Sequence, residues 1–257
     1  QKDGIARLDH AAVLALGVAS FLLSLILTSV MIWLSPRIGF VDQPGHRKIH
    51  TNPKPLGGGV AMFWGFAVPL VGIVLAPILL DRVGWIENSQ AYLGGVERRS
   101  PLAIGLLVSM FAMHLLGLID DRRALGPFIK LFIQLGITTA LVSCFDLRAL
   151  TTLDNLGLGR IPSIVVTVLW IGAITNAFNF LDNMDGLSAG VAAVCTTAFL
   201  VTALSIGQWF VAGSLALLLG SLLGFLVWNF PPAKIFMGDS GSLLIGLVLG
   251  VLTVRTT

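Results

Sequence analysis

The sequence has 257 residues, of which 56% are hydrophobic and only 11% are charged, and its mean hydropathy is +0.92. A soluble domain carries ~25% charged residues, so this chain lacks the polar surface that a globule in water needs. The composition also excludes disordered, coiled-coil, collagen-like and secreted disulfide-rich proteins, and a net charge of +3 does not indicate nucleic acid binding. We therefore expect an all-α, polytopic membrane helix bundle.

Hydropathy predicts about eight membrane spans, each needing ~20 apolar residues. In chain order they cover 11–35, 57–80, 101–119, 127–145, 161–178, 187–206, 209–228 and 241–254. The loops between them alternate between the two faces of the membrane. Four polar segments (36–56, 120–121, 176–186 and 229–241) fall on one face, which predicts a single site there. Lys and Arg are shared equally between the faces, so the positive-inside rule gives no orientation.

The first of these polar segments carries a basic cluster, Arg47, Lys48 and His50, followed by three glycines at 57–59. Cations beside a glycine-rich turn suit a pyrophosphate. The alternative is a basic loop that faces the lipid headgroups.

Asp120 and Asp121 end the third span. A carboxylate at membrane depth costs ~2.5–3.5 kcal/mol, so it usually has a partner or a function. Two adjacent carboxylates can share a divalent cation, bind a cationic group or supply a general base. The alternative is that they are merely the first polar residues past the membrane. Lys130 begins the next span and either snorkels or neutralises phosphate charge over this pair.

Asn176, Asn179, Asp182 and Asp185 are spaced three apart, which keeps them on roughly one helix face. Two amides and two carboxylates there suit a metal–phosphate assembly or a sugar, although a helix-end turn is the alternative. Asp239 lies between Gly238 and Gly241, where the backbone can approach a phosphate closely. It is also a natural helix N-cap. His114, inside a span, is interpreted as a core histidine.

Together, hard oxygen ligands and flanking cations on one face favour Mg²⁺ with a phosphorylated substrate. Cys/His spacing typical of zinc is absent from the sequence, and so is a G-x-x-x-x-G-K-[ST] loop.

The motifs in this order resemble the polyprenyl-phosphate N-acetylhexosamine-1-phosphate transferase family (glycosyltransferase 4 type), in its WecA/TagO-like branch, related to MraY. The resemblance lies in D-x-P-x-x-R-K-x-H at 42–50, PLGG at 55–58, LIDD at 118–121, NAFNFLDNMDGL at 176–187 and FMGDSGS at 236–242. It implies transfer of a sugar-1-phosphate from a UDP-N-acetylhexosamine to undecaprenyl phosphate. UMP would be released, as the initiating step of cell-envelope polysaccharide synthesis (O-antigen, teichoic acid or a related glycan).

The resemblance also implies roles for individual residues. Asp239 would be the leading Mg²⁺ ligand (Mn²⁺ being the alternative ion), and Asp120, with Asp121 beside it, would deprotonate or position the lipid phosphate and share the metal. Substrate contacts would come from Arg47, Lys48, His50, Lys130, Asn176, Asn179, Asp182 and Asp185. Because nucleotide sugars are cytosolic, the site would face the cytoplasm of a bacterial inner membrane, with the amino terminus in the periplasm. A homodimer is left open.

Family members usually have ten or eleven spans and a histidine-rich loop after the ninth. Residues 1–257 are therefore expected to form a single integral membrane transferase domain that lacks the C-terminal spans and this loop. Two alternatives from other classes are an ion-coupled transporter, suggested by the membrane carboxylates, and an intramembrane aspartyl protease, suggested by Gly238-Asp239. A CDP-alcohol phosphotransferase is disfavoured, because Leu187–Gly190 stands where that family's pattern continues.

Overall fold

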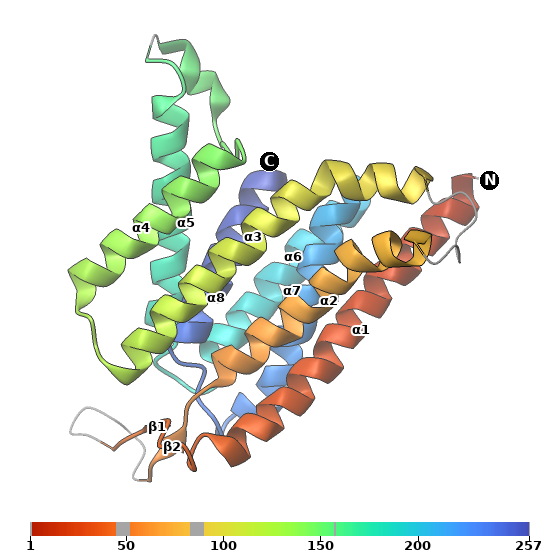
Figure 1. Ribbon diagram of the computed structural model, residues 1–257. Coiled ribbons are helices and arrows are strands. Elements are labelled where there is room, and N and C mark those ends of the chain that lie inside the picture. Colours follow the sequence, from red (N-terminus) through yellow and green to blue (C-terminus); the bar gives the residue numbers. More distant parts are fainter. Residues whose placement is uncertain (1, 45–51, 83–89, 157, 257) are drawn as a thin grey trace.

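The computed structural model describes residues 2–44, 52–82, 90–156 and 158–256, with the side chains of 10–44, 52–75, 101–155 and 158–256. These residues form an α-helical bundle with one short strand pair (Figure 1). The helices are α1 Lys2–Leu34, α2 Gly58–Arg82, α3 Gln90–Arg122, α4 Pro127–Cys144, α5 Ile161–Leu181, α6 Leu187–Ser205, α7 Trp209–Asn229 and α8 Asp239–Thr256. A 3₁₀ helix, η1 Thr151–Leu156, and strands β1 Val41–Asp42 and β2 Lys54–Pro55 complete the elements.

Eight helices of the described chain are long and apolar enough to cross a membrane, which confirms the prediction of about eight spans. The largest difference is in α3, which begins at Gln90 rather than at residue 101 and contains Pro101. The charged run at 97–99 ends the apolar span but not the helix, because hydropathy marks the hydrocarbon thickness and not the helix end. The apolar part of α3 is Pro101–Arg122, so Asp120 lies in its last turn.

Helix α1 packs along α7 through small residues. A Cβ at Gly220 of α7 would lie 2.1 Å from the Gly17 carbonyl oxygen of α1, so the two backbones are in direct contact. Two hydroxyls of α1 cross the interface: Ser20 donates to the Leu217 carbonyl at 2.6 Å and Ser24 to the Ser221 carbonyl at 2.7 Å. Close small-residue contacts and interhelical hydrogen bonds are the forces that hold helices together in lipid.

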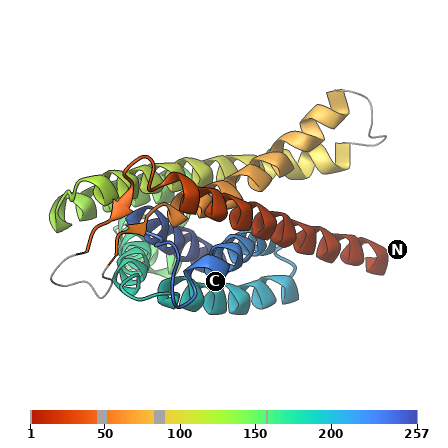
Figure 2. The ribbon, with the colours of Figure 1, turned by 90° about the horizontal axis from the view of Figure 1, so that it is seen from below.

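Helix α8 lies inside the bundle, and every residue from Ser240 to Val254 is buried (Figures 1 and 2). Two neighbouring helices each present it with a glycine, and α8 presents one of its own to a third helix. A Cβ at Gly59 of α2 or at Gly117 of α3 would lie 2.3 Å from a backbone nitrogen of α8, and a Cβ at Gly246 of α8 would lie 2.3 Å from Thr175 Cα of α5. The first turn of α8 is therefore held at backbone distance by α2 and α3, and a later turn by α5.

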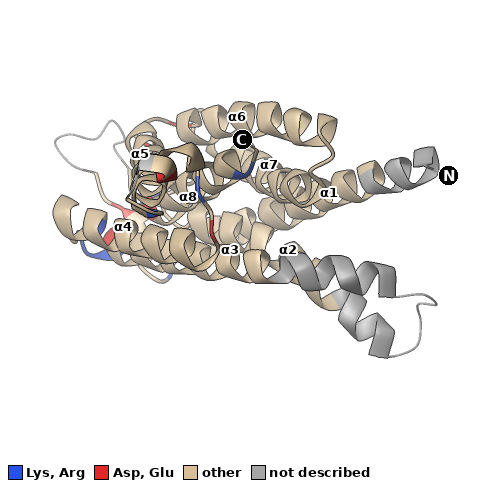
Figure 3. Cartoon of the chain, turned by 90° about the horizontal axis from the view of Figure 1, so that it is seen from above, with Lys and Arg blue, Asp and Glu red and all other residues tan. Residues whose placement is uncertain are grey.

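Helices α4 and α5 form an outer hairpin, in which α4 packs mainly against α3 and α5 (Figure 1). The outer face of α4 carries exposed aromatic residues, among them Phe128 and Phe132. At the turn of the hairpin, Arg148 pairs with Asp146 at 2.6 Å and also with Asp154. Charged residues elsewhere stand at helix ends and in loops, with almost none along the spans (Figure 3).

Candidate active site

The four polar segments meet at one end of the bundle, as predicted. Strands β1 and β2 pair antiparallel there, with Val41 opposite Pro55 and Asp42 opposite Lys54. The loop before α8 then hydrogen-bonds to each neighbouring segment: Phe236 N–H to the Pro55 carbonyl at 2.9 Å, Gly58 N–H to the Phe236 carbonyl at 3.1 Å, and Ala233 N–H to Asp185 Oδ2 at 2.8 Å. Segments that are distant in the sequence are therefore in direct contact at this end of the bundle.

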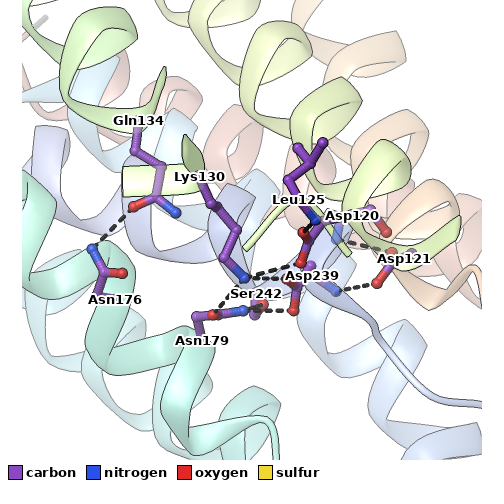
Figure 4. Close-up of polar contacts among 10 residues, drawn as sticks. Asp120, Asp121, Leu125, Lys130, Gln134, Asn176, Asn179, Asp239 and Ser242 are labelled. Atoms are coloured by element: carbon purple, nitrogen blue, oxygen red, sulfur yellow. Dashed lines mark hydrogen bonds and ion pairs between the residues drawn. The ribbon is translucent and has the colours of Figure 1, made fainter. Parts of the chain in front are cut away.

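Lys130 stands at the centre of this end, and its ammonium group touches three elements (Figure 4). It donates to Asp120 Oδ2 of α3 and to Asn179 Oδ1 of α5, each at 3.2 Å, and it forms an ion pair with Asp239 of α8. Only 15% of its side chain is exposed. Lys130 therefore ties the first turn of α4 to the ends of α3, α5 and α8.

Asn179 completes the contact with α8. Its amide nitrogen donates to Asp239 Oδ1 at 2.7 Å and to Ser242 Oγ at 2.9 Å (Figure 4). Because the nitrogen faces α8, the amide oxygen faces Lys130 and accepts its hydrogen bond. Both carboxylate oxygens of Asp239 are thus held by α4 and α5 side chains.

Asp120 and Asp121 differ in their partners although they are neighbours. Asp120 Oδ1 accepts the Leu125 N–H at 2.7 Å, which fixes the loop between α3 and α4, and its other oxygen binds Lys130. Asp121 instead accepts two backbone N–H groups of α8, that of Asp239 at 2.7 Å and that of Ser240 at 3.1 Å. Asp121 therefore caps α8 from another helix.

This cap corrects the interpretation of Asp239 as an N-cap. Asp239 is the first residue of α8, and the Gly238 carbonyl accepts the N–H groups of Gly241 and Ser242. Gly238 has φ +75°, and a Cβ there would lie 2.6 Å from Asp121 Oδ2, so glycine is required both by its conformation and by the closeness of the cap. The first two amides of α8 bind Asp121, so in this arrangement they do not receive a phosphate.

We expect the stability of the protein to fall from the wild type with Asp121 to Asp121→Asn, and further to Asp121→Ala. Asn can accept only one of the two amide hydrogens, and Ala leaves both unpartnered, a loss of roughly 1–3 kcal/mol per buried group. The Tm of the purified protein in detergent measures this order. A Mg²⁺ titration of activity separates the cap from a metal ligand: an activation constant raised more than about tenfold in Asp121→Asn contradicts the cap.

The remaining residues of the 176–186 segment do not share one helix face, because α5 ends at Leu181. Asn176 hydrogen-bonds Gln134 Oε1 at 3.0 Å, away from Lys130, and Asp185 binds the Ala233 N–H. Asp182 lies nearer the centre: burial, reinforced by the negative charges of Asp239 and Asp121, raises its pKa well above the usual range. The geometry thus brings Asn179 and Asp182 to the site and leaves Asn176 and Asp185 in supporting positions.

Arg47, Lys48 and His50 lie outside the described residues, so their contacts stay predictions. After them in the chain, the ammonium group of Lys54 donates to the Ala233 carbonyl oxygen at 2.6 Å. His114 is a core residue, as interpreted: it is 4% exposed, stacks on Phe63 at 4.8 Å between centroids, and its Nδ1 lies 3.1 Å from the Ser240 carbonyl.

Two residues of the network were missed from the sequence. Ser242 follows Asp239 by three residues and Gln134 follows Lys130 by four, so each lies on the same helix face as a predicted site residue. That spacing was the available signal.

The donor set fits a hard cation completed by substrate. Lys130 bridges the carboxylates of Asp120 and Asp239, because its ammonium group contacts an oxygen of each. Mg²⁺ is usually bound by one or two carboxylates together with substrate phosphates. Within the described residues, no three His, Cys, Asp or Glu side chains are grouped to hold a metal ion.

Comparison with known proteins identifies relatives over nearly the whole chain. It is 36% identical over 242 residues to the probable undecaprenyl-phosphate N-acetylglucosaminyl 1-phosphate transferase of Bacillus subtilis, covering 92% of the chain and 61% of the relative. It is 33% identical over 248 residues to the decaprenyl-phosphate N-acetylglucosaminephosphotransferase of Mycobacterium tuberculosis, covering 91% and 57%. The chain thus spans less than two thirds of these relatives.

A phospho-N-acetylmuramoyl-pentapeptide-transferase of Desulforudis audaxviator is 34% identical over 261 residues, covering 94% of the chain and 75% of the relative. The model of glycosyl transferase family 4 matches residues 103–257, which is more than half of the chain and includes Asp120, Lys130 and Asp239. The chain belongs to glycosyl transferase family 4.

Proposed function

We propose that this chain carries the catalytic face of an enzyme that transfers N-acetylhexosamine-1-phosphate from a UDP-sugar to undecaprenyl phosphate. The observation that carries the proposal is the cluster of Lys130, Asp120, Asn179 and Asp239, which joins four helices at one membrane face. Family membership, and relatives named for sugar-1-phosphate transfer to undecaprenyl or decaprenyl phosphate, support the same chemistry.

In the proposed reaction, an oxygen of the lipid phosphate attacks the β-phosphorus of the UDP-sugar. The bond between that phosphorus and the bridging oxygen breaks, and the oxygen leaves with UMP. The product is a lipid diphosphate that carries the sugar. Since both reactants are anionic, the main tasks of the protein are positioning and neutralisation of charge.

The contacts suggest how this chain's residues share those tasks. The ammonium group of Lys130 lies between Asp120 and Asp239. Phosphate oxygens of the substrates that enter this space would meet its positive charge. Asp120, anchored by Leu125, orients the lipid phosphate or takes its proton, while Asn179 holds Asp239 in place. Mg²⁺, or Mn²⁺ in its place, would be held by Asp239 and Asp120 and would neutralise the pyrophosphate. Asp182, Arg47, Lys48 and His50 are proposed to contact the nucleotide sugar.

Exposed aromatic residues on the two helices that carry Lys130 and Asn179 suit the lipid acceptor. Phe128 is 75% exposed and Phe132 77% exposed on α4, and Phe180, next to Asn179, is 77% exposed on α5. Phe128 and Phe132 lie two residues on either side of Lys130 and so point away from it, toward the outside of α4. A polyprenyl chain in the bilayer can lie along this outer face, close to the end of the bundle that carries the site. Because nucleotide sugars are cytosolic, we assign this end of the bundle to the cytoplasm of a bacterial inner membrane and the amino terminus to the periplasm.

The transporter and protease alternatives fit less well. Transporter sites lie near the bilayer midplane, whereas Asp120, Lys130 and Asp239 lie in terminal turns of their helices. A protease would need a second catalytic aspartate beside a tyrosine, and the only tyrosine, Tyr92, is followed by Leu93.

We expect the purified full-length protein to release UMP only when a UDP-N-acetylhexosamine, polyprenyl phosphate and a divalent cation are all present. Release is measured across a panel of UDP-sugars, with omission of the lipid phosphate as the control. A folded sample that forms no UMP with any donor contradicts the proposal. Ternary-complex kinetics would support direct attack, and ping-pong kinetics a covalent intermediate.

A further inference from the structure

A pair of amide side chains lies one helical turn below the cluster, between α4 and α5. Asn176 Nδ2 donates to Gln134 Oε1 at 3.0 Å, and also to the Gly172 carbonyl of its own helix at 2.8 Å (Figure 4). The bond to Gly172 fixes which end of the Asn176 amide carries the nitrogen. Gln134 must then present its oxygen, so both amide orientations follow from the contacts.

Gln134 is 1% exposed, and its Nε2 is a buried donor without a hydrogen-bond partner among the described residues. Such a donor is costly, so an apolar side chain of similar size would be the better choice for stability alone. A polar residue at that position indicates a need for directional contact, and the one directional contact of its side chain in the described chain is to Asn176.

Apart from this pair, the hydrogen bond from Lys130 to Asn179 Oδ1 at 3.2 Å is the polar side-chain contact that joins α4 to α5 among the described residues. The outward face of α4 is exposed, and its contact with α5 near Gln134 is apolar: Leu135 approaches Gly172 so closely that a Cβ there would lie 3.0 Å from Leu135 Cδ2. Apolar contacts in lipid tolerate sliding, whereas an interhelical hydrogen bond does not. Gln134 and Lys130 are four residues apart on α4, on the same face of the helix. A shift of α4 along α5 at Gln134 therefore moves Lys130 by the same amount.

We propose that Gln134 and Asn176 are a positioning pair that sets the register of α4 on α5 and thereby places the Lys130 ammonium group among Asp120, Asn179 and Asp239. Neither amide touches the substrate. This role replaces the substrate contact that the spacing of Asn176 suggested. The catalytic consequence rests on the function proposed above, while the register itself does not.

The kinetic test exchanges the two side chains. Gln134→Asn and Asn176→Gln each give a pair of the wrong total length, and we expect each to lower kcat roughly 10- to 100-fold, the effect of misplacing a catalytic group by about 1 Å. The double exchange restores the total length and should recover kcat to within about threefold of the wild type. Thr139→Val, an exposed change on α4 whose hydroxyl bonds only its own helix, is the control and should leave kcat unchanged.

A spectroscopic test measures the register without activity. Spin labels are placed at Phe132 of α4 and Leu169 of α5, both exposed, after Cys144 and Cys195 are replaced by Ala. Each single exchange should shift or broaden the label–label distance by roughly 2–5 Å, up to one helical turn, and the double exchange should restore it.

The proposal is overturned if the double exchange is as impaired as Asn176→Gln, which would mean that substrate recognises Asn176 directly. It is also overturned if the single exchanges leave both kcat and the distances unchanged. If the wild-type protein forms no UMP, the proposed function fails, and the distances alone then decide on the pair.

Discussion

Asp239→Asn is expected to lower kcat for UMP formation by roughly 10²- to 10³-fold, the loss seen when a charge-stabilising group is removed from an active site. Asp239 holds both Lys130 and the Asn179 amide. An asparagine would turn an NH₂ group toward one of these two donors and would also remove the negative charge that attracts a cation. The measurement is steady-state UMP release at saturating substrates.

The control for this prediction is Asp146→Asn, the same chemical change at the opposite end of the bundle, where Asp146 pairs with Arg148. It should keep kcat within about twofold of the wild type. Both variants should elute and melt as folded proteins. Full activity in folded Asp239→Asn would remove Asp239 from the metal and charge-stabilising role.

Gly117→Ala should have a similarly large effect through the backbone. A methyl group there would lie 2.3 Å from Ser240 N and 2.5 Å from the Asp239 carbonyl carbon, and neither atom can yield without moving α8. Overpacking of a tight core typically costs ~1–3 kcal/mol. Since Asp120 and Asp121 follow on the same helix, moving α3 from α8 also separates the carboxylates of the site. We therefore expect a lowered Tm together with an activity loss of at least about 100-fold.

Gly190→Ala provides the matched control, because Gly190 lies in α6 with nothing within 4 Å of a Cβ. Alanine favours a helix over glycine by ~1 kcal/mol, so this variant should melt at the wild-type temperature or above and keep its activity. A wild-type Tm for Gly117→Ala would show that α3 and α8 can separate freely and would contradict the tight crossing.

The sequence predicted the architecture well, because each span is recorded locally as a run of apolar residues. The clustering of polar segments at one face followed from counting spans, and His114 was correctly interpreted as a core residue. The sequence also indicates Asp120, Lys130, Asn179 and Asp239 as candidate site residues, since charged and amide groups are rare in such a chain and each of these stands beside an apolar run.

What the sequence could not predict is which neighbour each side chain meets. Asp120 and Asp121 are the same residue type, yet they face different partners because adjacent residues on a helix point about 100° apart. Asn176 and Asp185 belong to the same motif as Asn179, but the end of α5 at Leu181 and the depth of Asn176 separate them from the cluster. Whether a side chain fits at Gly59 or Gly117 depends on α8, which comes more than a hundred residues later in the chain.

The cap of α8 by Asp121 has a consequence for biogenesis. Asp121 and the Asp239 amide that it accepts are 118 residues apart, so at ~5–20 residues per second a ribosome needs about 6–24 s between them. During that interval α3 is already made, while its carboxylate has no helix end to bind. The nascent chain must keep Asp121 hydrated or otherwise paired until the eighth span arrives, and insertion of α8 then caps its own first turn and brings Asp239 to Lys130 in one step.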